Sequence, residues 1–280
     1  MSLVINTNVA SLNAQRNLSN TQGALAKNLS HLSSGLRISS ASDDAAGLAI
    51  SENLKAQIRS VSQASRNASD GVSLSQVAEG ALEQVGNLLT RMRELAVEGA
   101  NGTVDTNSSA YINNEFKSLT SEIDRIANVT AFNGTTLLAG GAISTGVTIQ
   151  VGINNTSNDV ITVAISGVAS TAIGSTGFIS GQNLNTQLAA QTSLAVIDVA
   201  ISQVSSIRAS LGALQNRFGV TTSNLASLGQ NLSAANSRIR DVDVASETAD
   251  LTRNQILEQA GVAVLAQANQ LPSAALSLLK

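Results

Sequence analysis

Apolar residues recur at helical spacing over long stretches of this chain, and this pattern limits what it can fold into. Between Leu194 and Leu232, aliphatic residues and one phenylalanine follow one another almost always at steps of three, four or seven. Such steps place side chains on one face of a helix. A helix of roughly forty residues or more is therefore expected, well beyond the usual length in a globular domain. The chain has one proline, Pro272, so almost nothing interrupts long helices.

Four further segments show the same spacing. They cover about residues 18–36, 50–96, 108–129 and 248–280, and the second pauses near "NASDG" before it continues as a heptad pattern. Aromatic residues make up 2% of the sequence, so the core has to be built from alanine, leucine, isoleucine and valine. Small aliphatic side chains suit closely packed helices better than a wide globular interior.

A different pattern separates the third and fourth helical segments. Asn133 and Gly134 form a turn dipeptide, and "VTIQVG" and "VITVAIS" alternate and carry β-branched residues on either side of "INNTSND". The surrounding residues, from 139 to about 187, are rich in glycine, serine, threonine and asparagine. This segment is expected to be a small β-rich insert on the surface.

Two breaks in the helical pattern, near residues 39–44 and 238–246, lie at similar distances from the two ends. The ends are therefore expected to pair beyond a common joint. Ser42, Asp43 and Asp44 suit the start of the following helix, as caps and first-turn residues. Taken together, the pattern predicts a mainly α fold: a long antiparallel helical rod with paired, coiled-coil-like terminal helices and a small insert containing a β-hairpin.

Several classes of function are disfavoured by what the sequence lacks. It has no cysteine, so disulfides, thiolate chemistry and cysteine metal sites are excluded. His31 is the one histidine, and we expect it to be a solvated or packing residue rather than a metal ligand. No nucleophile–base pair, phosphate-binding glycine loop or HExxH motif is present, so neither an enzyme nor a cofactor is expected.

Charge and hydropathy disfavour nucleic acid and membrane as partners. The net charge is −3 and the pI about 5.2, which leaves no electrostatic reason for nucleic-acid binding. Arg238, Arg240 and Asp241 in "SRIRD" are expected to form ion pairs at the joint. No apolar run is expected to reach membrane-spanning length, and the amino end lacks the pattern of a Sec-type signal peptide.

Long motifs in order along the chain carry a family resemblance. The amino end has "INTNVASLNAQRNL" and "LSSGLRISSASDDAAGLAISE", the middle has "RMRELAVEGANGT" and "SEIDRIANVTAFNGTTLL", and the carboxyl end has "SRIRDVDVASETADLTRNQILEQAGVAVLAQANQLPSAALSLL". These stretches closely resemble bacterial flagellin over about residues 1–140 and 190–280. Several long matches in the right order are far more specific than a single short motif.

The resemblance implies a structural subunit of the helical flagellar filament, used for swimming. It implies export through the flagellar secretion channel without a cleaved signal peptide, an extracellular location, and a secretion chaperone and filament cap protein as partners besides the chain itself. Residues 1–43 and 241–280 would form the inner tube. Residues 44–140 and 186–240 would form the surrounding helical layer, with 141–185 as a short variable insert in place of large outer domains.

Assembly of this kind agrees with simple energetics. Hiding a large aliphatic side chain is worth roughly 1.5–3 kcal/mol, so terminal helices apolar on more than one face are expected to bind neighbouring subunits. In the free monomer the ends are expected to stay largely disordered, because one pair buries too little to offset the ordering entropy. The residues expected at subunit interfaces are Leu18, Leu25, Leu29, Leu32, Leu36, Leu251, Ile256, Val262 and Leu265.

The same resemblance points to recognition by a vertebrate Toll-like innate receptor. Arg91, Glu94 and Leu95 in "TRMRELAVEGANGT" match the recognised motif, and Glu115 matches a further contact position. The alternative is that these residues serve packing and assembly only. For the whole chain, the alternatives are a flagellin-like hook–filament junction protein and a secreted receptor-binding protein. Serine and threonine residues of the insert are possible sites for O-linked sugars.

Overall fold

The structure is a computed structural model that describes residues 7–141, 143–174 and 177–277. The chain divides into two compact units, one made of residues 1–58 with 230–280 and the other of residues 59–229. Two long helices, α2 (Ala45–Gly99) and α4 (Gln187–Arg240), contribute to both units. The mainly α fold with a small strand-containing region is as predicted.

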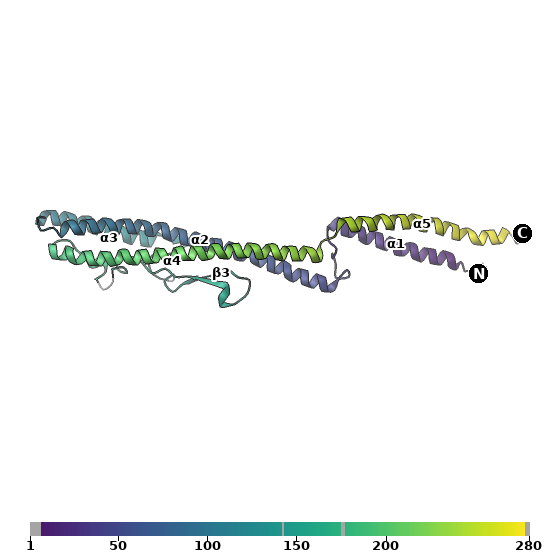
Figure 1. Ribbon diagram of the computed structural model, residues 1–280, viewed down its shortest axis with the longest axis horizontal. Coiled ribbons are helices and arrows are strands. Elements are labelled where there is room, and N and C mark those ends of the chain that lie inside the picture. Colours follow the sequence, from purple (N-terminus) through teal and green to yellow (C-terminus); the bar gives the residue numbers. More distant parts are fainter. Residues whose placement is uncertain (1–6, 142, 175–176, 278–280) are drawn as a thin grey trace. The chain divides into compact units, whose positions relative to one another are not determined.

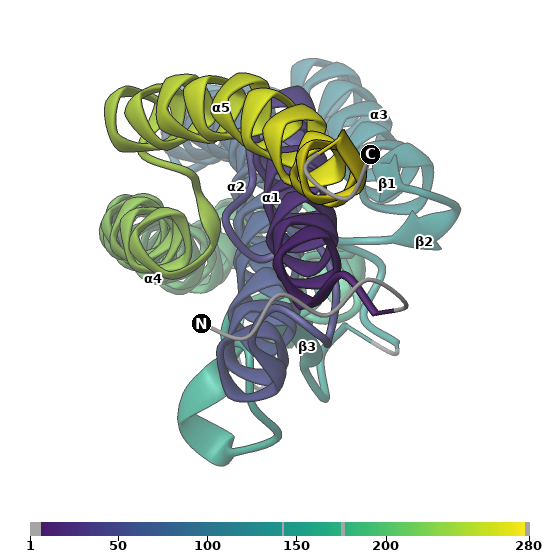
Figure 2. The same ribbon diagram turned by 90° about the vertical axis from the view of Figure 1, so that its right-hand side faces the viewer.

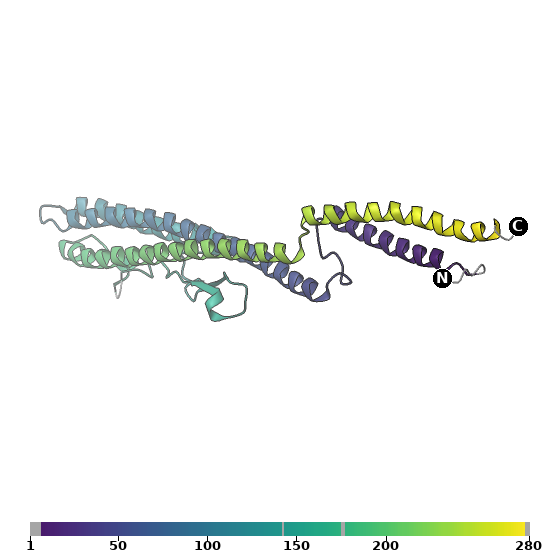
Figure 3. The same cartoon turned by 45° about the vertical axis from the view of Figure 1, so that its right-hand side comes forward.

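The first unit is built on an antiparallel pair of helices, α1 (Val9–Ser34) and α5 (Val244–Ser277). Figure 1 shows them side by side, and Figure 3 shows the same pairing from another angle. The side chain of Asn8 caps α1 by accepting a hydrogen bond from the Ser11 N–H. Gly35 ends α1 in the left-handed conformation, at a φ of 72° that glycine adopts without strain.

The second unit combines α2 and α4 with α3 (Thr106–Val129) and two antiparallel hairpins. The first hairpin pairs β1 (Ala131–Phe132) with β2 (Thr135–Thr136) around the Asn133–Gly134 turn, and Figure 2 shows its two strands adjacent. The second pairs β3 (Val147–Gln150) with β4 (Val160–Val163) in register Val147 to Val163. Short 3-10 turns lie at Ser157–Asp159 and Ile179–Gly181. The predicted hairpin of "VTIQVG" with "VITVAIS" is confirmed, and the predicted turn dipeptide Asn133–Gly134 lies at the turn of the first hairpin.

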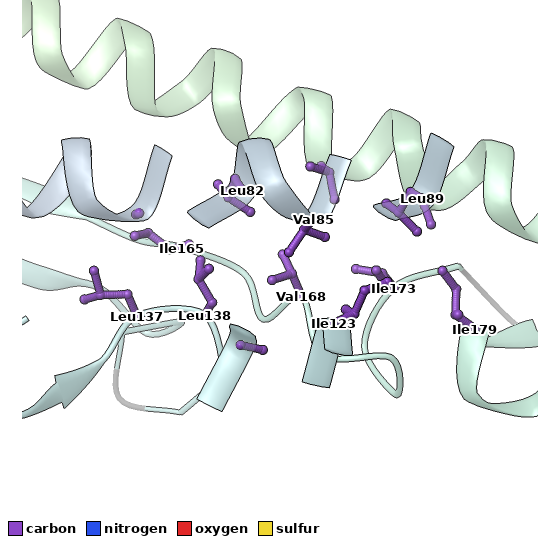
Figure 4. Packing of buried hydrophobic residues seen from close by; sticks show 14 of the residues in the cluster. Leu82, Val85, Leu89, Ile123, Leu137, Leu138, Ile165, Val168, Ile173 and Ile179 are labelled. Atoms are coloured by element: carbon purple, nitrogen blue, oxygen red, sulfur yellow. The ribbon is translucent and has the colours of Figure 1, made fainter. Parts of the chain in front are cut away.

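The core of the second unit lies between the helices and the insert. Figure 4 shows Leu82, Val85 and Leu89 of α2 facing Ile123 of α3 and a row of aliphatic side chains that come from the insert and the segment before it. These side chains belong to Leu137, Leu138, Ile165, Val168, Ile173 and Ile179. The expectation of an insert lying on the surface is therefore wrong in part, because isolated apolar residues within its polar sequence are fully buried.

The predicted pause near "NASDG" is also wrong, since α2 runs through it without a break. Gly71 explains the difference. A Cβ atom placed on Gly71 would lie 2.6 Å from the ring of Phe218 on α4 and 2.9 Å from Ile149 on β3. The glycine allows the close approach of a buried aromatic ring, which is a packing role rather than a stop signal.

By length and composition alone, α4 is long and apolar enough to cross a membrane. The expectation that no apolar run approaches that length is thus wrong for α4. Its buried side chains nevertheless recur at steps of three, four and seven, the spacing of a helix that packs one face into a core. These buried residues are Ala190, Ser193, Ile197, Ala200, Val204, Leu211, Phe218 and Leu225.

Candidate functional sites

The pairing of α1 with α5 is fixed by polar contacts along its length. The Asn8 side chain donates to the Ala268 carbonyl at 2.8 Å, the Ser11 hydroxyl lies 2.7 Å from Asn269, and Gln22 donates to Glu258 at 3.3 Å. Between these contacts, half-buried positions recur every three or four residues on both helices. This is the narrow seam of a two-helix coiled coil.

The nine predicted interface residues do not share one face. Five of them are half-buried positions of the seam within the chain: Leu18, Leu25, Leu32, Leu251 and Leu265. Leu36 follows α1 and pairs with Asp241 in an isolated β-bridge. Leu29, Ile256 and Val262 are 51%, 61% and 52% exposed. Only these last three are directed away from the partner helix and are free to contact another molecule.

α5 exposes more large apolar side chains than these. Among the side chains that the structure describes, the exposed residues of this kind on α5 are Val244, Ile256, Leu257, Val262 and Val264, while those on α1 are Val9, Leu12 and Leu29. A single helix partner covers one stripe of α5, and the remaining apolar surface stays in contact with water. Clustered apolar side chains that a single partner helix leaves exposed often mark a site of protein–protein contact.

The joint at the inner end of the pair is a short β-like contact between the two breaks. The Arg37 N–H donates to the Arg240 carbonyl at 2.7 Å, and the Val242 N–H donates to the Gly35 carbonyl at 3.1 Å. The guanidinium of Arg240 lies 2.6 Å from Glu52 on α2. The predicted pairing of the two breaks is confirmed, and so is an ion pair of Arg240 there.

The connector that joins α1 to α2 contains Ser42, Asp43 and Asp44, and these residues do not all cap α2 as predicted. Asp44 caps α2 by accepting from the Gly47 N–H at 2.9 Å. Asp43 turns back instead and accepts from the N–H groups of Ser39 and Ser40, while Lys27 lies 3.1 Å from it. The hydrogen bond to Lys27, followed by those from the connector, holds the pKa of Asp43 well below its usual value.

Ser42 also has no capping bond to α2, because its hydroxyl pairs with that of Ser40 at 2.7 Å. The expectation that all three residues serve the start of α2 is therefore corrected, with Asp44 alone in that role. Because Asp43 accepts several hydrogen bonds at once, the connector is an ordered turn rather than a free linker.

The predicted receptor-recognition residues are only partly together at the surface. Arg91 lies 3.0 Å from Glu94 and 2.8 Å from Glu115 on α3, and all three side chains are about half exposed. Hydrogen bonds from Glu94 and then Glu115 raise the pKa of Arg91 above its usual value. Leu95, by contrast, is 1% exposed and belongs to the core. Leu95 is therefore not available at the surface for direct contact with a receptor.

A third cluster was not anticipated from the sequence. His31 is 7% exposed, and it lies with Lys27 on α1, Asp43 in the connector and Glu247 on α5. The four-residue spacing of Lys27 and His31 indicates a shared helix face, but their acidic partners come from distant parts of the chain. Among the described residues, no group of three or more acidic or histidine side chains is arranged to hold a metal ion.

The hollows of the second unit are open and lack catalytic pairs. One, of about 690 Å³, lies between the loop joining β3 to β4 and the side of α4, with Asp159 and Arg217 at its edge. Another, of about 350 Å³, lies beside the first hairpin and is mostly apolar. Neither lining combines a nucleophile with a base.

Comparison with known proteins matches almost the whole chain. The model of the bacterial flagellin N-terminal helical region matches residues 5–145, and that of the C-terminal helical region matches residues 194–279. A flagellin of Halalkalibacterium halodurans is 46% identical over 278 residues, which is 99% of this chain and 100% of that protein. The flagellin of Bacillus subtilis is 45% identical over 304 residues, 99% of each chain.

Among solved structures, one described as a flagellar hook-associated protein of Vibrio parahaemolyticus covers 71% of this chain and 100% of its own, with a TM-score of 0.60. At 17% identity, this likeness concerns the fold alone.

Proposed function

Since the chain belongs to the bacterial flagellin family, we propose that it polymerises with copies of itself into the helical filament that propels a swimming bacterium. Flagellins are structural subunits of a filament that lies outside the cell, and they are not enzymes. The observation that carries the proposal is the full-length match to flagellins at both ends of the chain. The proposal includes export through the flagellar secretion channel, with a secretion chaperone and a cap protein as transient partners.

The apolar surface of the terminal pair supports this proposal. Leu29, Ile256 and Val262 each leave half or more of their surface in water, and burying such side chains in a neighbouring subunit gives roughly 1.5–3 kcal/mol each. In the proposed filament, residues 1–43 and 241–280 form the inner tube. Residues 44–140 and 186–240 form the layer around it, and 141–185 replace larger outer domains.

The test is assembly on seeds of short filament fragments, followed by negative-stain electron microscopy. Full-length protein is expected to form long filaments, and a variant lacking residues 241–280 to form none. A sharper variant is Ile256→Asn with Val262→Asn, which changes exposed side chains only. It should raise the concentration needed for growth at least tenfold, since each lost contact weakens every subunit interface.

Leu188→Asn is the matched control, because Leu188 is 72% exposed on α4 and lies outside the terminal pair. Growth of the double variant at the normal concentration would contradict the role given to α5. Full-length protein that stays monomeric on seeds would favour the two other candidates, a hook–filament junction protein and a secreted receptor-binding protein.

A second proposed function is recognition of the free monomer by a vertebrate Toll-like receptor. The exposed cluster of Arg91, Glu94 and Glu115 supports it, because a surface arginine held by two carboxylates offers a rigid, charged contact. Leu95 supports the cluster from below by fixing α2 in the core. Using the same surface for assembly and for the receptor would restrict recognition to the unassembled protein.

The receptor test uses Arg91→Ala, because changing buried Leu95 would also disturb the fold. Arg125→Ala is the control, since Arg125 is likewise an exposed arginine paired with a glutamate three residues away. Arg91→Ala is expected to raise the monomer concentration for half-maximal signalling in receptor-expressing cells about tenfold or more. Equal signalling by the two variants would remove Arg91 from the contact.

A further inference from the structure

The cluster around His31 brings together three segments of the first unit. His31 lies in the last turn of α1, Asp43 in the connector and Glu247 in the first turn of α5. The Nδ1 atom of His31 is 3.3 Å from Glu247 Oε1, and the Nε2 atom is 3.8 Å from Asp43 Oδ1. All three side chains are less than a fifth exposed, so their charges interact with little screening by water.

A neutral imidazole does not satisfy the hydrogen-bonding groups around His31. It carries one N–H, and when Nδ1 donates that hydrogen to Glu247, Nε2 presents a lone pair towards a carboxylate. Nε2 is buried and has no hydrogen-bond partner. Two acceptors then face each other away from water, which is unfavourable. A protonated imidazole has two N–H groups, one for each carboxylate.

The charges of the cluster also favour the protonated form of His31. Asp43 and Glu247 carry two negative charges, and Lys27, 3.1 Å from Asp43, supplies one positive charge. Protonation of His31 brings the sum to zero. Arg240 at the end of α4 is engaged by Glu52 of α2, so it does not supply the missing charge at His31.

We propose that His31 is a pH-dependent switch: in its protonated form it binds the connector through Asp43 and α5 through Glu247, and on deprotonation it releases the connector. Histidine ordinarily changes charge between about pH 5 and pH 8. The two carboxylates that face the ring favour the charged imidazole, so the contacts of His31 with the connector and with α5 are expected at mildly acidic pH. The inference concerns contacts within one chain and goes beyond assembly.

The sequence makes the switch directly measurable, because His31 is the only histidine in the chain. Aspartate and glutamate titrate near pH 4 and lysine above pH 10. Histidine is the side chain whose ordinary pKa lies between these two ranges. Labelling histidine with ¹³C gives one imidazole signal, whose chemical shift reports the charge of His31 in the full-length protein.

Hydrogen exchange at the joint reports whether the connector is held in place. The N–H groups of Ser39 and Ser40 bond to Asp43, and those of Arg37 and Val242 bond across the joint. Exchange of these amides is measured in free protein and in sedimented filaments and corrected for the intrinsic pH dependence. In whichever of the two samples the joint is folded, we expect these amides to be protected about tenfold more strongly at pH 5.5 than at pH 8.

His31→Gln is uncharged at every pH and should show the weaker protection at both values. Glu258→Gln is the matched control, because Glu258 contacts Gln22 in the same helix pair, away from His31, and should leave the pH response intact. Equal protection at both pH values in wild-type protein, or absence of protection at these amides in both free and assembled protein, would overturn the switch. Failure to assemble would be seen separately by electron microscopy and concerns the proposed function alone.

Discussion

At the scale of single residues, the chain places its unusual side chains where two segments approach closely. Gly71 lies opposite Phe218, and Asp43 holds the turn of the connector. Neither role belongs to the residue type alone, because glycine more often ends a helix and aspartate before a helix more often caps it. Both roles come from a partner distant in sequence or from a backbone that turns back.

Gly71→Ala is expected to destabilise the second unit. Helix propensity alone would give a gain of about 1 kcal/mol, but the new methyl group meets the Phe218 ring, and overpacking of a core costs about 1–3 kcal/mol. Urea unfolding should show a net loss of up to about 2 kcal/mol. Gly80→Ala, where nothing lies within 4 Å, should instead stabilise the protein. A gain in both variants would contradict the close contact at Gly71.

We expect Asp43 to produce a second pH effect, opposite in sign to that of His31. Its pKa is lowered in the folded joint by the hydrogen bonds of Lys27 and the connector. The stabilisation is therefore present above the ordinary aspartate pKa and is lost as the pH falls through the lowered value. Protection of the Ser39 and Ser40 amides should decline in strong acid, and Asp43→Ala, which removes the accepting oxygen, should abolish it even at pH 6. Unchanged protection in Asp43→Ala would show that the connector is held by other groups.

At the scale of elements, the insert is attached to the helices through both apolar and polar contacts. Both oxygens of Asp124 on α3 accept from Ser170, one from its N–H at 2.7 Å and one from its hydroxyl at 2.8 Å. Asn113 accepts from the Leu184 N–H at 2.9 Å, and Gln203 accepts from the Gly174 N–H at 2.9 Å. These side chains satisfy backbone groups of a segment that lacks regular structure, so the insert has a defined place.

Asp124→Ala should loosen this attachment. Hydrogen bonds to a charged group each contribute about 1.5–3 kcal/mol, and the variant loses two. We expect a clear fall in the urea midpoint and faster proteolysis within residues 164–185. Asp198→Ala is the control, since its pair with Arg93 is about half exposed on both sides and should have little effect on stability. Equal effects of the two variants would exclude a special role for Asp124.

At the scale of the whole molecule, the two units differ in how much they bury. The apolar core cluster belongs entirely to the second unit, from Ala68 to Phe218. In the described parts of α1 and α5, the buried hydrophobic residues are Ala14 and Ala268. Alanine contributes little apolar area, whereas ordering a residue costs roughly 1–2 kcal/mol. The terminal pair is therefore expected to depend on neighbouring subunits for its stability.

Hydrogen exchange on free monomer tests this asymmetry. Amides of α1 and α5 should exchange at least a hundredfold faster than those around Leu89 and Ile123 in the core, because local opening of the pair costs little free energy. On assembly, both terminal helices should become protected. Strong protection of α1 and α5 in free monomer would contradict this prediction and show that the pair is stable by itself.

The sequence by itself determined the helical segments, the hairpin of the insert, the Asn133–Gly134 turn and the pairing of the two breaks, because periodic spacing and turn dipeptides are local signals. The sequence also indicated the protein family. Only the tertiary structure decided that Leu95 is buried, that Leu18 and Leu25 lie in the seam while Leu29 is exposed, and that insert side chains fill the core. Helical spacing indicates which residues share a face but not what that face contacts. For His31, the carboxylate of Glu247 comes from more than two hundred residues along the chain, and only folding brings the two together.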